Sequence, residues 1–189
     1  MNIALIVTDA GPLITLAIAD ALDTLTLMGT RIIIPDIVHL EVTRHIGRPG
    51  AAEILAWSGV QTNQVEIGHT EEFEEYVELL ALDPARRLRN RGELAAAEIL
   101  ARELAGGIDA GLLLFEDSDL KKASFMVRIP DRVLLLSTSS FLYGLQRKHL
   151  IADAEHILAR ATAIRGPAIY RQMASASPGA ADVLSDWIE

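Results

Sequence analysis

The fold is decided by the first stretch of the chain, which reads Ile3-Ala4-Leu5-Ile6-Val7-Thr8-Asp9-Ala10-Gly11-Pro12. Its apolar part, residues 3–7, is a run of strand-favouring side chains that ends at Thr8-Asp9. Pro12 suits the first turn of a helix, because the N–H that proline lacks would be unpaired there. The stretch therefore predicts a buried strand, an acidic residue at its end, and a helix directly after it.

Short apolar runs and helical stretches alternate along the rest of the chain. Strands that are apolar on both faces and alternate with helices are typical of a parallel sheet covered on both sides. We therefore predict a three-layer α/β/α fold with a central, mainly parallel sheet. The further strands are expected at 32–34, 60–67 (an edge strand), 112–115 and 133–136, and the helices from residue 12, at 35–46, 51–57, 71–82, 93–105 and 120–127.

Length and hydropathy define the organisation of the chain. Its 189 residues suit about one domain. We assign residues 1–150 to this domain and residues 151–189, which look helical to about 164, to a C-terminal helical appendage. No apolar run approaches the ~20 residues of a membrane-spanning helix, so we expect a cytoplasmic protein with no membrane partner.

Composition excludes several classes of function. The chain has no cysteine, which excludes a disulfide scaffold, a thiolate metal site and a cysteine nucleophile. Half of the residues are hydrophobic, too many for an intrinsically disordered protein. The net charge of −9 counts against nucleic-acid binding, although it does not exclude a local basic patch.

Acidic residues stand at the ends of two predicted strands. Asp9 follows the first strand, and Asp117 and Asp119 follow the strand at 112–115. If both strands are parallel and central, these carboxylates meet at one edge of the sheet, where open α/β sheets hold their functional crevice. The alternative is that each aspartate only caps the helix that follows it, a position that Asp favours.

Glu41 lies on the helix expected after residue 35. It shares one helix face with Ile37 and Leu40, and this face places its carboxylate at the rim of the core. The alternative is a glutamate that reaches the solvent or pairs with Arg44.

Glu93 follows Gly92 at the start of another expected helix. The alternative is an ordinary first-turn glutamate, which the helix dipole favours by itself. Glu98 lies further around the same helix, and we expect it to be solvated surface.

Several carboxylates in one place need a compensating charge, because like charges at close range raise one another's pKa. A hard divalent cation such as Mg²⁺ or Mn²⁺, which prefers oxygen ligands, supplies that charge. Such ions activate water and stabilise the leaving oxygen in phosphodiester hydrolysis.

The ordered set of acids resembles the PIN-domain family over about residues 3–150. The resemblance is carried by Thr8-Asp9-Ala10-Gly11-Pro12-Leu13-Ile14, by Ile34-Pro35 leading to Glu41, by Gly92-Glu93, and by Leu113-Leu114-Phe115-Glu116-Asp117. It implies a metal-dependent ribonuclease, an endonuclease rather than an exonuclease, with Mg²⁺ or Mn²⁺ held by Asp9, Glu41, Glu93 and Asp117. Asp119 would be a fifth ligand or an alternative to Asp117.

Many bacterial members of this family are VapC-type toxins. By resemblance we therefore expect toxin activity, an antitoxin protein as a partner, and a homodimer. The chain departs from the common pattern at two positions: Glu93 stands where many members have Asp, and Phe115 where a hydroxyl residue often precedes the fourth acid.

Basic residues follow or precede the acids in sequence. We expect them to rim the acidic cleft and to bind RNA phosphates. The alternative is a solvated helix face that balances neighbouring acids. The candidates are Arg44, Arg89, Arg91, Lys121 and Lys122.

Two other classes of function compete with the nuclease hypothesis. One is a PIN-like module that binds a partner or RNA without cleaving it, for which loss of an acid would be the sign. The other is a phosphatase that acts through a phospho-aspartate. It would want a second Asp two residues after Asp9, where the chain has Gly11.

Overall fold

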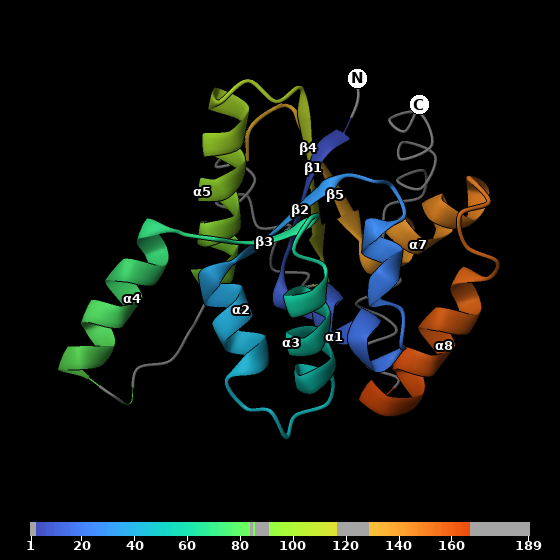
Figure 1. The fold of residues 1–189 in the computed structure, drawn as a ribbon, viewed down its shortest axis with the longest axis horizontal. Helices are drawn as coiled ribbons and strands as arrows, with labels where there is room; N and C mark the ends of the chain where they lie inside the picture. Colours follow the sequence, from blue (N-terminus) through green and yellow to red (C-terminus); the bar gives the residue numbers. More distant parts are fainter. Residues whose placement is uncertain (1–2, 84, 86–90, 117–128, 167–189) are drawn as a thin grey trace.

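The computed structural model describes residues 3–83, 85, 91–116 and 129–166. In this part of the chain a five-stranded sheet has the order β3-β2-β1-β4-β5, and each neighbouring pair of strands is parallel. Figure 1 shows the sheet at the centre of the molecule. The strands are β1 (Ile3–Thr8), β2 (Arg31–Pro35), β3 (Val65–Gly68), β4 (Ala110–Phe115) and β5 (Val133–Ser137).

Helices cover both faces of the sheet. In Figure 1, α4 and α5 lie to the left of the strands, and α7 and α8 lie to the right. The helices are α1 (Ala10–Ile18), α2 (Asp36–Thr43), α3 (Ala51–Val60), α4 (Glu71–Leu82), α5 (Arg91–Ala105), α7 (Thr138–Arg147) and α8 (Ala154–Arg165), with a 3-10 helix η1 (Leu22–Thr26).

Two hydrophobic clusters lie on opposite faces of the sheet, because alternate residues of a strand point to opposite sides. Leu5 and Val7 of β1 pack with the apolar residues of α5. Ile6 of β1 packs with Leu112 and Leu114 of β4 and with the apolar residues of α1, α7 and α8. The prediction of a three-layer α/β/α fold with a parallel sheet is therefore confirmed.

The structure corrects the sequence prediction in two places. Residues 60–67 were expected to form one edge strand, but α3 extends to Val60 and only Val65–Gly68 pairs with β2 at the edge. Helix α7 was not predicted, since its first turn carries the polar residues Thr138, Ser139 and Ser140, all of them buried. The helix expected at 120–127 lies outside the described residues.

Glu98 is not solvated surface, as the sequence suggested. Its carboxylate accepts hydrogen bonds from the backbone amides of Glu71 and Glu72 at 2.9 to 3.4 Å, and so caps the N-terminus of α4. Only the tertiary contact between α4 and α5 creates this role.

The described part of the C-terminal region packs on the domain. Ala154, Leu158 and Ala161 of α8 are buried in the same cluster as α1. The boundary near residue 150 stays a prediction. None of the helices in the described ranges combines the length and the apolar character that spanning a membrane requires.

Candidate active site

Asp9 lies at the carboxyl edge of the sheet, between β1 and α1. Its backbone amide donates to the carbonyl oxygen of Leu114 at 3.0 Å, and this bond extends the β1–β4 ladder by one residue. The end of β1 is thereby fixed beside the end of β4.

The Asp9 side chain does not cap α1. Asp9 is the N-cap residue, but its side chain makes no capping hydrogen bond. It continues the series Leu5 and Val7, which faces α5. A Cβ atom added at Gly92 of α5 would lie 3.1 Å from Asp9 Oδ1, so α5 approaches the carboxylate closely at this residue. The side chain therefore makes no N-capping hydrogen bond, and its interaction with the start of α1 is with the adjacent amide of Ala10.

The surroundings of Asp9 raise its pKa to about 7, from an ordinary value of 3.8. Burial of the carboxyl group is the largest cause, and it is opposed by a hydrogen bond from the Ala10 amide. The carboxylates of Glu41, Glu93 and Glu116 add to the increase, because like charges disfavour ionisation. Acidic groups from α2, α5 and the end of β4 therefore lie close enough to act on Asp9.

Glu41 lies near the end of α2 and is half-buried, as the position at the rim of the core predicted. Burial raises the pKa of its carboxyl group, and the charges of Arg44 and Arg48 lower it by less. The alternative was that Glu41 pairs with Arg44. Arg44 acts on Glu41 electrostatically, but no salt bridge joins the two side chains in the described structure.

Glu93 is in the first turn of α5 and is partly buried. Its position directly after Gly92 places it beside the contact between α5 and Asp9. The carboxylates predicted at Asp117 and Asp119 lie outside the described residues, and so do the predicted RNA-binding residues Arg89, Lys121 and Lys122.

Glu116 is the acidic residue that the sequence analysis missed. It follows β4 directly and is 4% exposed. Thr138 at the start of α7 donates to Glu116 Oε1 at 2.7 Å, and Arg165 of α8 donates to Glu116 Oε2 at 2.7 Å. A buried glutamate thus has both oxygens held by neighbouring helices.

One signal in the sequence could have found Glu116. Leu112 and Leu114 are alternate residues of a strand, and Glu116 is the next member of that series. The series faces α1, so Glu116 points to the opposite side of the sheet from the Leu5, Val7 and Asp9 series.

Arg165 connects the C-terminal helix to this edge of the sheet. Besides Glu116, its guanidinium donates to the Thr15 hydroxyl and, at 3.4 Å, to the carbonyl oxygen of Gly11. A Cβ atom at Gly11 would lie 2.9 Å from Glu116 Cβ, so α1 approaches Glu116 closely only because residue 11 is glycine. Sequence reasoning had no signal for Arg165, which contacts a residue 49 positions away.

Asp36 is an acidic residue at the end of a strand that serves the fold. It follows β2, and its carboxylate accepts hydrogen bonds from the Thr70 amide at 3.0 Å and the Thr70 hydroxyl at 2.7 Å. It also accepts from the Ile37 amide at 2.9 Å. These bonds join α2 to the start of α4 and leave Asp36 out of the acidic site.

The predicted basic rim is only partly available. Arg44 is exposed at the end of α2 and acts electrostatically on Glu41, and so does the exposed Arg48. Arg91 instead donates to the Glu72 carboxylate at 3.1 Å and lies 3.7 Å from the Glu75 carboxylate, so its charge is engaged by α4.

The chemistry of the donor set suits a hard divalent cation, because every acidic group around Asp9 is a carboxylate. Within residues 3–83, 85, 91–116 and 129–166, however, no three such groups are close enough to form a metal site. What the described residues show is an electrostatic effect of Glu41, Glu93 and Glu116 on Asp9. Of these carboxylates, Glu116 is held by Arg165.

Comparison with protein families supports the resemblance seen in the sequence. The PIN domain family model matches residues 5–130 of the chain. This match covers more than half of the sequence, and the chain belongs to the PIN domain family. Searches of curated proteins and of solved structures gave no match.

Proposed function

We propose that the protein is a cytoplasmic, metal-dependent ribonuclease that hydrolyses RNA phosphodiester bonds at the carboxyl edge of its sheet, as an endonuclease. The observation that supports this most strongly is that the carboxylates of Glu41 in α2 and Glu93 in α5 both act electrostatically on the buried Asp9 at that edge. Membership of the PIN domain family, whose members are often nucleases, adds support to this proposal.

Asp9, Glu41 and Glu93 are the residues that would hold Mg²⁺ or Mn²⁺, together with Asp117 or Asp119. When bound, the metal ion would activate water and stabilise the leaving oxygen of the RNA strand. A cation would also favour the ionised form of Asp9, whose pKa the surroundings raise to about 7. The high pKa of this carboxyl group is thus a feature that a cation would reverse.

The other side chains prepare the site in this proposal. Arg165 and Thr138 hold the Glu116 carboxylate in one orientation, and the Arg165 charge offsets part of the negative charge beside Asp9. Arg44 and Arg48 are the described cations that remain exposed near Glu41, and they are our candidates to bind RNA phosphates.

The proposal is tested with an Asp9→Asn variant and a fluorescent single-stranded RNA. We expect cleavage by the wild type only with Mg²⁺ or Mn²⁺. The variant should lose at least the ~100-fold that removal of a supporting residue costs in metal sites. Asp109→Asn is the matched control, because Asp109 is exposed just before β4, at the opposite edge of the sheet, and its loss should leave cleavage unchanged.

Two outcomes would decide against this function. Equal cleavage by wild type and Asp9→Asn protein would exclude Asp9 from the reaction. RNA binding by the wild type without any cleavage, in either metal, would favour the non-catalytic PIN-like module instead.

Toxin activity with an antitoxin partner and a homodimeric state are further parts of this proposal, based on resemblance to VapC-type toxins. If the protein is a toxin, its induction in a bacterial host should arrest growth, and Asp9→Asn should abolish that arrest. Growth equal to that of uninduced cells would argue for a nuclease without a toxic role.

A further inference from the structure

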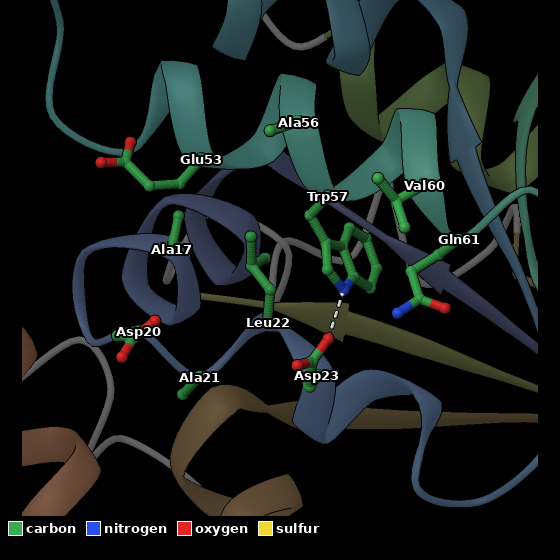
Figure 2. Close-up of a pocket in the computed structure, with 10 residues that line it drawn as sticks. All are labelled: Ala17, Asp20, Ala21, Leu22, Asp23, Glu53, Ala56, Trp57, Val60 and Gln61. Carbon is green, nitrogen blue, oxygen red and sulfur yellow. Dashed lines mark hydrogen bonds between the residues drawn. The ribbon is translucent and has the colours of Figure 1, made fainter.

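A second concave surface lies at the opposite end of α1 from Asp9. It is a cleft of about 410 Å³ between the end of α1 and η1 on one side and α3 on the other, and we call it the α1–α3 cleft. Figure 2 shows its lining. The volume falls in the range of about 300–1,000 Å³ that is usual for ligand pockets.

The α1–α3 cleft has an apolar floor and two apolar side chains that reach the solvent. Ala21 and Leu22 are buried at its base, Trp57 is half-buried, and Val60 is 79% exposed. Trp57 Nε1 donates to Asp23 Oδ1 at 2.9 Å, which fixes the orientation of the indole ring (Figure 2). Rigid aromatic side chains of this kind anchor partners in protein interfaces.

The charged side chains of the cleft are all acidic. Asp20, Asp23 and Glu53 line it and are exposed, and Figure 2 shows Asp20 and Glu53 toward one end and Asp23 beside Trp57. Among the described residues, no salt bridge reaches these carboxylates. Arg160 of α8 lies nearby, but it donates at 3.1 Å to the backbone oxygen of Asp20.

The cleft is elongated along α3. Its lining residues on this side run from Glu53 to Gln61, a distance of about 12 Å at ~1.5 Å per residue. An occupant of this length with both apolar and positive groups matches a peptide better than a single ion. A second copy of the chain is a poorer match in charge, because each chain carries a net charge of −9.

We propose that the α1–α3 cleft binds a basic amphipathic segment of another protein. An apolar side chain of the segment packs between Leu22 and Trp57, and its lysine or arginine residues pair with Asp20, Asp23 and Glu53. Binding in this mode combines burial of an apolar anchor with complementary charge around it. The inference does not depend on nuclease activity.

The test measures binding of a fluorescent synthetic peptide of leucine and lysine in a helical pattern, at near-physiological salt. This peptide should bind. Two control peptides should not bind: one in which every lysine is replaced by glutamate, which reverses the charge, and one in which every leucine is replaced by serine, which removes the apolar side chains. The combined Asp20→Asn, Asp23→Asn and Glu53→Gln variant should bind about tenfold more weakly, because each exposed pair contributes up to ~1 kcal/mol.

The substitutions are chosen to keep the fold. Asparagine tolerates the positive φ of 50° at Asp20, and it keeps an acceptor for Trp57 at residue 23. The matched control is one variant that combines Glu74→Gln, Glu78→Gln and Asp131→Asn. It removes three exposed acids that lie outside the α1–α3 cleft, and it should change peptide binding less than about twofold. Val60→Ser removes the exposed apolar side chain and should weaken binding about threefold.

Three results would overturn the proposal. The first is absence of peptide binding to the wild type, and the second is equal weakening by both triple variants, which would indicate attraction to the acidic protein as a whole. The third is sedimentation of the wild type as a dimer that the Val60→Ser variant dissociates, which would make a second copy the occupant.

Discussion

Asp9 and Glu116 follow neighbouring parallel strands at the same edge of the sheet, but their carboxylates have different surroundings. Asp9 faces α5, accepts a hydrogen bond from the Ala10 amide and has other acids nearby. Glu116 faces α1, α7 and α8, where Thr138 and Arg165 hold its two oxygens. Asp9 therefore has a raised pKa, whereas the negative charge of Glu116 is paired with the guanidinium of Arg165.

The difference shows how one sheet edge can separate two tasks. Alternate residues of a strand face opposite sides of the sheet. Glu116, directly after β4, lies one residue further along than the position level with Asp9, directly after β1, so the two side chains reach different helices. The Glu116 side is fixed by a buried ion pair. The Asp9 side keeps excess negative charge, which is the property that a cation-binding site requires.

The largest expected effect on stability comes from breaking the buried pair. Arg165→Met should lower the free energy of unfolding by about 3–5 kcal/mol, because it leaves the Glu116 carboxylate buried without its counter-charge. Urea denaturation at neutral pH measures this loss. Glu116→Gln added to Arg165→Met should restore part of it, since the uncompensated charge is then absent.

Arg31→Met is the control for the Arg165 prediction. Arg31 pairs with Glu66 and Glu103 at the opposite edge of the sheet, but its side chain is 43% exposed. Exposed pairs contribute about 1 kcal/mol or less. Equal losses in the two variants would contradict the special role of the Arg165 pair.

An effect of similar size is expected from pH acting on Asp9. The folded protein keeps the Asp9 proton up to about pH 7, whereas the unfolded chain loses it near 3.8. The folded state therefore binds more protons between these values, and the Asp9 contribution to the free energy of unfolding falls as pH rises. At about 1.4 kcal/mol per pKa unit, the effect is on the order of a few kcal/mol.

Asp9→Asn isolates this effect, because asparagine does not titrate. The variant should exceed the wild type in stability at pH 8 without divalent metal, and this advantage should shrink as pH falls toward 4. Denaturation curves at several pH values measure the difference. A difference that stays constant over this range would show that the Asp9 pKa is not raised.

The smallest effects are expected at the two glycines that touch these acids. Gly11→Ala brings a methyl group to 2.9 Å from Glu116 Cβ, and we expect a loss of about 1–3 kcal/mol from overpacking. Gly92→Ala meets only side-chain ends, Val38 Cγ2 at 3.0 Å and Asp9 Oδ1 at 3.1 Å, which can move. Its loss of stability should be smaller.

Thermal denaturation compares the two glycine variants directly. Gly59→Ala in α3 is the control, because the added methyl group would meet no atom within 4 Å outside its chain neighbours and the nearby backbone of its own helix, and the helix should gain about 0.5–1 kcal/mol. A loss at Gly92 as large as that at Gly11 would show that the Asp9 side of the edge is as rigid as the Glu116 side.

Much of the architecture could be predicted from sequence, because the signals are local. Residues 112–115 are apolar without interruption, which a strand covered on both faces requires. The prediction of one edge strand at 60–67 was wrong, since the weak alternation of apolar residues there does not distinguish the end of α3 from the short edge strand β3. Helix α7 was missed because its buried first turn is polar.

The candidate site could be predicted only as far as residue types and order allow. Asp9 was proposed from its place at a strand end and Glu41 from its helix face at the rim of the core, whereas Glu93 rested on the resemblance to the PIN-domain family. Their roles stay predictions, and the structure shows only that Glu41 and Glu93 act electrostatically on Asp9. Arg91 was expected at the rim, but the structure pairs it with Glu72, a contact that depends on how α4 packs against α5.

The sequence by itself determined the parallel α/β/α architecture, the acid at the end of β1 and the likeness to the PIN domain family, because these depend on local periodicity and on the order of residues. Only the tertiary structure decided which acid receives a counter-charge. Arg165 reaches Glu116 and Thr15 from a helix far along the chain. Such a contact depends on helix packing in three dimensions, which no local pattern encodes.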